Sequence, residues 1–379
     1  MSERERGTPS SLGFTRTPSE DDPRRDPRLL GSLARVAPGT ELRQGIDDII
    51  RSHEGALIVI GDPDALSFLY SGGMKIDLPF TSQHLYEVAK MDGAIIANDE
   101  LTKIAYVNVQ LMPDPTIASS ETGTRHRTAE RVAKQTNALV ISVSQQRETV
   151  SIFQGPRRYQ LDPVATVLAK TNQALATLDT YRSRLEQVLT RLTALEFQNA
   201  VVLDDVLIVL QRAELTTRMA EEIERNCVEL GAEGRLIRMR LGELLGDIPG
   251  EKSAVVNDYH VVGPGPEAVL SIEGLAALSY QELLEFDRLA ELLGFPRNVN
   301  TLDHSVSPRG YRVLAHIPRI PPTVIEHVVA DMDGLESIVR ASQRDLEAVQ
   351  GVGAARARDI REGLRRLQEH NLVDRYLQL

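Results

Sequence analysis

The sequence is poor in residues that several common functions require. Its 379 residues include one cysteine and no tryptophan, and aromatic residues make up only 4%. The lone Cys227 excludes an internal disulfide and a CxxC metal site. It lies in the helical pattern ERNCVELG and is predicted to be an ordinary buried thiol. The scarcity of aromatic residues argues against a stacking platform for single-stranded nucleic acid.

Long apolar runs are also missing. No run approaches the roughly 20 residues of a membrane helix, and Asp204 and Asp205 interrupt runs such as AVV and VLIVL. The N-terminus is polar and charged and has no apolar signal core. We therefore predict a cytoplasmic protein without membrane contact.

The usual phosphate loops are absent too. Neither a Walker loop (GxxxxGK[ST]) nor a GxGxxG motif occurs, so any nucleotide must be bound in another way. The formal net charge of −11 is not that of a body coated for nucleic acid. From Arg309 to Leu379, however, eleven arginines stand against ten acidic residues, so the acidity lies elsewhere. DNA contact must therefore be made by a small local module.

Composition and periodicity divide the chain into four parts. Residues 1–28 are a mixed-charge segment rich in Ser, Pro, Arg and Asp, and are predicted to be a disordered tail. Residues 29–157 alternate between helical and strand patterns, residues 158–295 are dominated by long helices, and residues 300–379 are helical with short turns. The predicted fold class is therefore multidomain: an α/β domain with a mixed sheet, followed by all-α domains.

The α/β domain is predicted from its periodicity. Leu42, Ile46, Ile49 and Ile50 fall on one face of a helix, which Gly55 ends. Short apolar runs predict strands over residues 56–62, 92–99, 104–112, 138–145 and 149–155, and helices are predicted over residues 84–91 and 128–135. The last two strands are joined by the charged turn QRE and are expected to form a hairpin.

The long-helix region carries a seam of apolar residues in steps of three and four. The seam consists of Leu178, Tyr181, Leu185, Val188, Leu192 and Leu195. It is either an ordinary bundle core or a coiled-coil-like contact between subunits. Helix ends are predicted at Gly231, Gly234, Gly246 and Gly250, and residues 247–268 are predicted to be a loop or linker.

Two N-terminal motifs are candidates for chemistry. In KMDGAIIAND, Asp92 stands just before a predicted strand, and Gly93 is the next residue after Asp92. A carboxylate there can hold a divalent cation while the backbone approaches a ligand closely, although Asp-Gly is also a common turn.

The second motif is TGTRHRTAERVAK, residues 122–134. Gly123 and Thr124 lead into Arg125, His126, Arg127 and Thr128, and a helix follows. Free N–H groups, the positive end of a helix dipole and two guanidinium groups together predict a phosphate site. A merely solvated basic helix start is the alternative, but cations are misplaced at a helix N-terminus unless an anion is present.

The C-terminal motif is AVQGVGAARARDI. Gly351, Val352 and Gly353 form a tight turn between two helical patterns, and its N–H groups and the next helix N-terminus can hold a DNA phosphate without reading bases. Arg356 and Arg358 add positive charge nearby. This region resembles the helix-hairpin-helix family of DNA-binding modules.

An earlier segment, HIPRIPPTVIEHVV, resembles a degenerate first hairpin of the same family. Arg319 stands within its turn, between Pro318 and Pro321. Glycines are missing and the prolines remove N–H donors, so the second hairpin is the better candidate for phosphate contact.

KMDGA and GTRHRTAE, about 30 residues apart, together resemble the signature of the diadenylate cyclase family. The order of cyclase domain, helical linker and hairpin module extends this resemblance over nearly the whole chain after about residue 29. The resemblance implies condensation of two ATP molecules into cyclic di-AMP and two pyrophosphates. It also implies a homo-octamer, association with the nucleoid, and regulation by DNA, such as a branched junction, bound without sequence specificity.

The same resemblance implies roles for individual residues. Asp92 holds Mg²⁺ or Mn²⁺ in catalysis, and Gly93 and Ala94 approach the nucleotide through their backbone. Phosphates are bound by Thr124, Arg125, His126, Arg127 and Thr128, while Leu111 and Ser144 lie by the adenine and the phosphates. His126 is a phosphate ligand or structural residue rather than a general base. A non-catalytic, nucleotide-sensing DNA-binding scaffold is the alternative function.

Overall fold

The computed structural model describes residues 22–296 and 302–377. The described chain divides into two compact units. The first, the α/β unit, holds Asp21–Ala176 and Glu221–Gly242, and the second, the helical unit, holds Thr177–Ala220 and Glu243–Leu379.

One mixed sheet of eight strands forms the centre of the α/β unit within the described residues. The strands are β1 (Ala56–Ile60), β2 (Tyr70–Ser71), β3 (Met74–Pro79), β4 (Ala94–Ala97), β5 (Lys103–Leu111), β6 (Leu139–Ser144), β7 (Thr149–Gln154) and β8 (Arg157–Gln160). Their order is β2-β5-β4-β1-β6-β7-β8, and β3 also pairs with β5. β1 and β4 are parallel and the other pairs are antiparallel. The mixed sheet predicted from the sequence is therefore confirmed.

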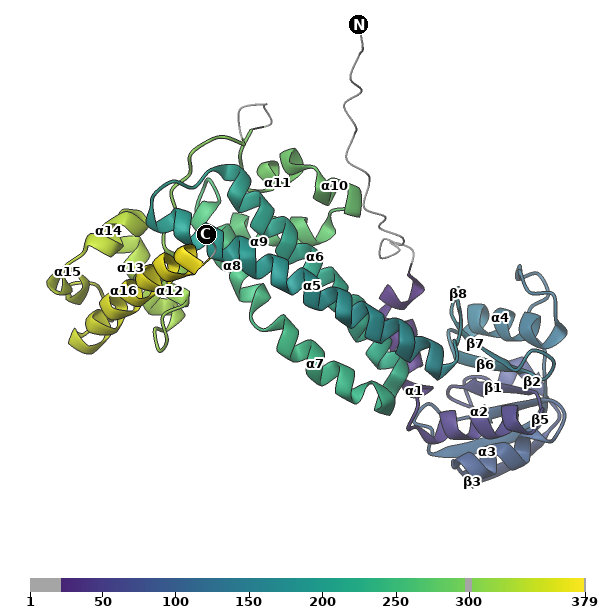
Figure 1. Cartoon of the computed structure of the whole chain (residues 1–379). Coiled ribbons are helices and arrows are strands. Elements are labelled where there is room, and N and C mark those ends of the chain that lie inside the picture. Colours follow the sequence, from purple (N-terminus) through teal and green to yellow (C-terminus); the bar gives the residue numbers. More distant parts are fainter. Residues whose placement is uncertain (1–21, 297–301, 378–379) are drawn as a thin grey trace, which may run out of the picture. The chain divides into compact units, whose positions relative to one another are not determined.

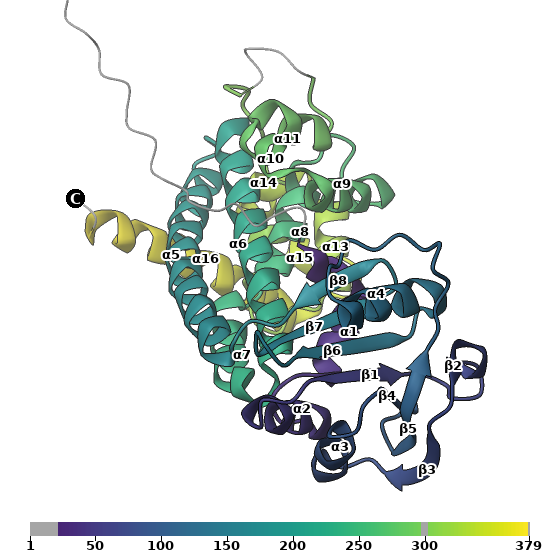
Figure 2. The same ribbon diagram turned by 90° about the vertical axis from the view of Figure 1, so that its right-hand side faces the viewer.

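Helices cover both faces of this sheet. They are α1 (Pro27–Arg35), α2 (Glu41–Arg51), α3 (Ser82–Ala89) and α4 (Thr124–Thr136), with short 3-10 turns at Pro23–Arg25 and Ser67–Leu69. In Figures 1 and 2, α4 lies on one face and α2 and α3 lie on the opposite face. Because strand side chains alternate, Ile58 and Ile60 pack with α1–α3, whereas Leu57 and Val59 pack with α4.

The helices that follow the sheet are long at first and then shorter. They are α5 (Val164–Phe197), α6 (Leu203–Leu230), α7 (Arg235–Leu245), α8 (Ile248–Tyr259), α9 (Pro266–Ala277), α10 (Tyr280–Leu284) and α11 (Phe286–Leu292), with a 3-10 turn at Gly231–Gly234. The boundary between the two units falls within α5, again within α6 and a third time within α7. None of the helices in residues 22–296 and 302–377 has the length and apolar character needed to cross a membrane.

The apolar seam of α5 is buried within this chain. Leu178, Leu185 and Leu192 have at most 1% of their surface exposed. Leu192 belongs to the core formed with α6, α8 and the following helices, and Leu185 packs with Ala213 and Ile248. At these positions the seam is the core of a helical bundle.

The chain ends in two helix–turn–helix pairs separated by a short helix. The elements are α12 (Tyr311–Ala315), α13 (Pro322–Asp331), α14 (Gly334–Arg340), α15 (Gln343–Glu347) and α16 (Ala354–Leu377). α12 and α13 correspond to α15 and α16 at an offset of 32 residues. At this offset five pairs of buried apolar residues match: Leu314 with Leu346, Ile317 with Val349, Ile320 with Val352, Ile325 with Ala357 and Val328 with Ile360. The two turns are thus repeats of one local structure.

Two predictions about these segments are wrong. Residues 22–28 were expected in the disordered tail, but Asp22 caps a 3-10 turn and Asp26 caps α1. Regular structure therefore begins before residue 28. Residues 1–21 lie outside the described residues. Residues 248–259 were expected in a loop but form α8, which Asp247 caps, so Gly250 lies inside a helix. Asp followed by Ile-Pro is in fact a helix-start pattern, because proline is favoured in the first helical turn.

Candidate active site

One edge of the sheet brings together residues that are distant in sequence. β1 runs parallel to β4 and antiparallel to β6, so the starts of β1 and β4 lie beside the end of β6. Ile58 is paired with Ile95 of β4, and Ala56 with Val143 of β6. If both pairings are continued beyond the start of β1, Gly55 lies between Asp92 and Ser144. β5 is antiparallel to β4, and therefore Leu111 ends at the same edge. The predicted residues of the KMDGA strand, Leu111 and Ser144 thus share one edge.

The first turn of α4 lies at this edge. α4 begins at Thr124, not at Thr128 as predicted, so Arg125, His126 and Arg127 are part of the helix. Gly123 is the N-cap and offers no side-chain hydrogen bond, and Arg127 N–H makes the first bond of the helix, to Gly123 O at 2.8 Å. The preceding N–H groups are open within the described residues. Positive side chains and open donors at a helix N-terminus form an anion site.

A hollow of about 400 Å³ opens beside the α4 turn. It is lined by Glu121, Thr122, Gly123, Thr124, Arg125, His126, Ser144, Gln145, Gln146, Arg147, Thr149, Ser151, Arg158 and Gln160. Four predicted site residues are in this lining, namely Thr124, Arg125, His126 and Ser144. The other predicted residues, which are Asp92, Gly93, Ala94, Leu111, Arg127 and Thr128, do not line it.

The two arginines of the motif point to different places. Arg125 donates from Nη1 to the Val143 carbonyl at 3.3 Å, so its guanidinium reaches the end of β6. Arg127 donates to the carbonyls of Glu121 at 3.3 Å and Thr122 at 3.2 Å, which ties it to the loop before the helix. Arg125 is therefore the one of the two that reaches the sheet edge.

Two further arginines in the hollow were not identified from the sequence. Arg147 lies in the turn between β6 and β7, and Arg158 lies on β8, where it forms an ion pair with Glu121 at 2.7 Å. The charged turn QRE was seen only as a hairpin connection. The strand β8 was not predicted, so nothing placed Arg158 beside the helix start. Both add positive charge to the hollow.

The buried Glu130 holds the loop in front of α4. Its carboxylate accepts hydrogen bonds from the Ser119 hydroxyl at 2.6 Å and from the Ser120 N–H at 3.0 Å, and it pairs with Lys134 at 2.7 Å. Burial opposes its charge, but these donors keep the pKa of Glu130 below its usual value. The loop that leads into the first turn of α4 is thus held in place by Glu130.

His126 lies among positive charges. Burial, and then the charges of Arg158, Arg125 and Arg147, lower the pKa of His126, while Glu121 opposes them. The imidazole is therefore neutral at neutral pH when no anion is bound.

The ring of His126 is expected to titrate below 6.5 in the free protein, and its pKa is expected to rise when ATP binds, because phosphate charge stabilises the imidazolium. Histidine ring signals followed by NMR across pH 5 to 8 test this, with His126→Gln assigning the signal. A pKa above the ordinary value in the free protein, or one that ATP leaves unchanged, would contradict this electrostatic account.

Asp92 is exposed, and among the described residues its carboxylate has no hydrogen bond or ion pair. No group of three or more His, Cys, Asp or Glu side chains in the described residues is arranged to hold a metal ion. This donor set fits Mg²⁺, which keeps several waters and is commonly bound by one or two carboxylates together with substrate phosphates. A divalent ion would thus bind here with the nucleotide rather than before it.

The two C-terminal turns have the same backbone form. Gly351 has φ of +82°, and the matching Arg319 has φ of +69°, a conformation that costs a side chain roughly 1–2 kcal/mol. Val352 is buried and anchors the second turn, whereas a Cβ at Gly353 would meet no atom within 4 Å. Arg356 donates to the Gly351 carbonyl at 2.6 Å. Of the predicted DNA-contact residues, Arg319, Gly351, Gly353 and Arg356 are therefore exposed at the two turns, whereas the Val352 side chain is buried.

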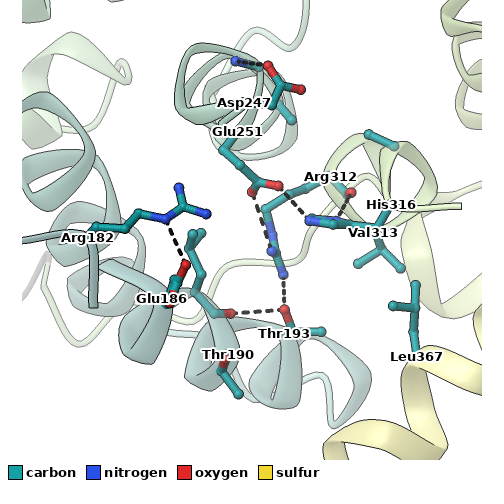
Figure 3. A pocket seen from close by; sticks show the side chains of 14 residues that line it. Arg182, Glu186, Thr190, Thr193, Asp247, Glu251, Arg312, Val313, His316 and Leu367 are labelled. Atoms are coloured by element: carbon teal, nitrogen blue, oxygen red, sulfur yellow. Dashed lines mark hydrogen bonds and ion pairs between the residues drawn. The ribbon is translucent and has the colours of Figure 1, made fainter. Parts of the chain in front are cut away.

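A buried network of charges joins α12 to α5 and α8 within the helical unit. Arg312, 1% exposed, pairs with Glu196 and donates to the Thr193 hydroxyl at 2.6 Å. Figure 3 shows Arg312 reaching Thr193 on one side and Glu251 on the other, with His316 beside them. His316 Nε2 lies 2.6 Å from Glu251 Oε1, a bond that raises the pKa of His316.

Asp258 extends this network to the start of α12. Its carboxylate accepts hydrogen bonds from the N–H groups of Gly310, Tyr311 and Arg312 at 2.7, 2.7 and 2.9 Å. Burial and the nearby Glu196 raise the pKa of Asp258 to about 7. The first helix of the C-terminal turns is thus attached to the bundle by buried ionic and backbone bonds.

The fold and the anion site define a nucleotide-binding α/β domain followed by a helical linker. Family models agree: "DisA bacterial checkpoint controller nucleotide-binding" matches residues 43–157, and the "DisA bacterial checkpoint controller linker region" matches residues 161–302. The chain is 48% identical over 347 residues to the DNA integrity scanning protein DisA of Carboxydothermus hydrogenoformans, covering 91% of this chain and 98% of that protein. It is 44% identical over 353 residues to the protein of that name from Acetivibrio thermocellus, covering 93% and 98%.

The chain therefore belongs to the DisA family, as its sequence motifs predicted. The enzyme class, diadenylate cyclase, is confirmed with it. Among solved structures, DacA from Staphylococcus aureus matches 36% of this chain and 87% of that chain at 23% identity, with a TM-score of 0.26. The low score adds nothing to the assignment.

Proposed function

We propose that this chain condenses two ATP molecules into cyclic di-AMP and two pyrophosphates, and that DNA bound at the C-terminal turns regulates the synthesis. One observation carries the catalytic half: Arg125 reaches across the sheet edge that holds Asp92 and Ser144, beside the open N–H groups of α4. Phosphoryl transfer needs positioning and positive charge more than covalent help from the protein. Incubation with ATP and Mn²⁺, followed by mass spectrometry of the products, tests the proposal.

The first turn of α4 binds the triphosphate. Arg125 supplies charge at the end of β6, and the backbone N–H groups of Thr124 and His126 supply open donors. The phosphate ligands also include the side chains of Thr124, His126, Arg127, Thr128 and Ser144. Arg127 would have to leave the two loop carbonyls that it now contacts.

The start of β4 receives the rest of the nucleotide. Gly93 has φ of +88°, and an added Cβ would lie 2.9 Å from the backbone of Asn108 and Val109, so only glycine fits. The backbone of Gly93 and Ala94 is thereby fixed beside the ligand, and Leu111 at the end of β5 packs by the adenine. Asp92 would hold Mg²⁺ or Mn²⁺, and the bound ion would supply positive charge to the attacking hydroxyl and the transferring phosphate.

Two copies of the chain complete the reaction. The 3′-hydroxyl oxygen of each ATP forms a bond to the α-phosphorus of the other, the bond from that phosphorus to pyrophosphate breaks, and the hydroxyl proton passes to solvent water. Each chain offers one Asp92 and one Arg125, so two α/β domains face each other with one ATP each. We extend this pairing to a homo-octamer made of two tetramers that meet through their cyclase domains.

DNA binds at the second C-terminal turn. The open backbone at Gly351–Gly353 and the N-terminus of the long helix α16 can hold a phosphate without reading bases. Arg356 and Arg319 add charge at the two turns. Binding of this kind follows backbone shape, so a branched or junction DNA is the proposed ligand and no base sequence is preferred.

Gly353→Leu is expected to weaken DNA binding about tenfold, or roughly 1.4 kcal/mol, because a side chain there blocks the approach of a phosphate. The fold should tolerate the change, since Gly353 has no positive φ and its Cβ direction is open. Basal cyclic di-AMP synthesis should remain unchanged. Affinity is measured by fluorescence anisotropy with a labelled four-way junction at fixed salt.

Gly242→Leu provides a matched control, because a Cβ at Gly242 also meets no atom within 4 Å and its φ is not positive. That variant should bind DNA as the unmodified chain does. Equal junction affinity in Gly353→Leu and Gly242→Leu would refute phosphate contact at this turn.

A further inference from the structure

Gly55 occupies the place between α2 and β1 where the sheet edge of the site begins. It lacks a positive φ, so its backbone conformation is open to any residue. It lies between Asp92 and Ser144 when the registers of β1 with β4 and β6 are continued. The need for glycine must therefore come from space rather than from backbone conformation.

The space above Gly55 is filled by Arg125. A Cβ at Gly55 would lie 2.0 Å from Arg125 Nη1, 2.9 Å from Arg125 Cζ and 3.2 Å from the Val143 carbonyl oxygen. The same Nη1 donates to that carbonyl at 3.3 Å. The guanidinium thus lies over a strand start that has no side chain.

We propose that Gly55 is a positioning residue for the cyclase reaction: it leaves the space in which Arg125 lies across the start of β1. This rests on the proposed role of Arg125 as a phosphate ligand. An arginine has five N–H donors in a planar fork. One bond to Val143 orients that plane, and the remaining donors stay available for phosphate oxygens at the edge that carries Asp92 and Ser144.

Other glycines near the site do not share this property. A Cβ at Gly123, the N-cap of α4, would have its nearest neighbour at 3.6 Å, an ordinary contact. Gly31 on α1 would meet nothing within 4 Å and lies in the same unit. Gly31→Ala is therefore a matched control for the change at Gly55.

The test is a double-mutant cycle on the full-length chain. Gly55→Ala is expected to lower kcat/KM for ATP about 100-fold, the effect of misplacing a phosphate ligand by about an ångström. Arg125→Ala should lower kcat/KM by at least as much, and the double variant should be no worse than Arg125→Ala alone. Gly31→Ala should retain the original kinetics. The ATP affinity of each variant is measured in parallel by calorimetry.

Several outcomes separate the possible failures. If Gly55→Ala retains full activity, Gly55 does not act through Arg125. The same conclusion follows if the fold-losses in kcat/KM of the two single variants multiply in the double variant. If Arg125→Ala leaves both ATP affinity and rate unchanged, the proposed phosphate role of Arg125 fails first. Thermal unfolding adds a structural check: Gly55→Ala should unfold near the original temperature, because the two closest atoms belong to the end of the flexible Arg125 side chain and the Val143 carbonyl oxygen at 3.2 Å needs only a small shift. A Gly55→Ala chain that stays unfolded even with Arg125→Ala would make Gly55 a packing residue and overturn the proposal.

Discussion

Asp92→Asn is expected to lower the rate of cyclic di-AMP synthesis about a thousandfold, equivalent to about 4 kcal/mol at the barrier. The amide is neutral and a poorer ligand for a hard cation. The metal ion would therefore bind less well, and the negative charge of the phosphates would be less well neutralised. Asp92 has no partner among the described residues, and the substitution should therefore leave folding intact. Rates are followed by chromatography of the nucleotide products at saturating ATP and Mn²⁺.

Asp99→Asn is the matched control for this change. Asp99 is exposed like Asp92, but it follows the opposite end of β4. Its substitution should leave the rate within about twofold, because an exposed carboxylate remote from the site contributes little to the barrier. Similar losses in both variants, or full activity in Asp92→Asn, would remove Asp92 from the metal site.

Arg312→Met is expected to destabilise the helical unit by about 3–5 kcal/mol. Methionine fills much of the same volume but leaves Glu196, 3% exposed, as a buried charge without its partner. α12 would lose its main ionic attachment to α5 and α8. Hydrogen exchange of the amides in α12 and α13 measures this loss of stability locally. The measurement does not require the two units to unfold in a single transition.

Arg182→Met provides the comparison for the buried pair. Arg182 pairs with Glu186 at 2.7 Å on the same helix, with 26% and 57% of the side chains exposed. Loss of such a pair costs about 1 kcal/mol or less. Equal exchange rates in the two variants would show that the buried network does not hold α12.

Much of the α/β domain could be predicted from local patterns. The apolar run ALIVI is a strand whose residues are all buried, and the alternation of Leu57, Ile58 and Val59 between two cores follows from the two-residue period. The start of α4 was misplaced because Thr124–Thr128 has no apolar periodicity. Its helical form depends on the packing of Ala129, Val132 and Ala133 against the sheet.

The less local features could not be predicted. Gly55 and Arg125 are 70 residues apart in the sequence, and the guanidinium occupies the volume that a side chain at residue 55 would need. No sequence pattern reveals such a contact. Arg158 reaches the hollow only because β8 pairs with β7, and the short run RRYQ has no apolar signal of a strand. Arg312 reads as a surface residue, yet it is buried because Glu196 and Thr193 from α5 partner it.

The most direct test of the central claim measures the products of the full-length chain with ATP and Mn²⁺. The account predicts cyclic di-AMP as the nucleotide product, with two pyrophosphates released for each molecule formed, and formation of both slowed about a thousandfold in Asp92→Asn. Mass spectrometry identifies the nucleotide, and a coupled assay counts pyrophosphate. Formation of ADP and phosphate in place of these products, or no turnover by a folded chain that binds ATP, would contradict it.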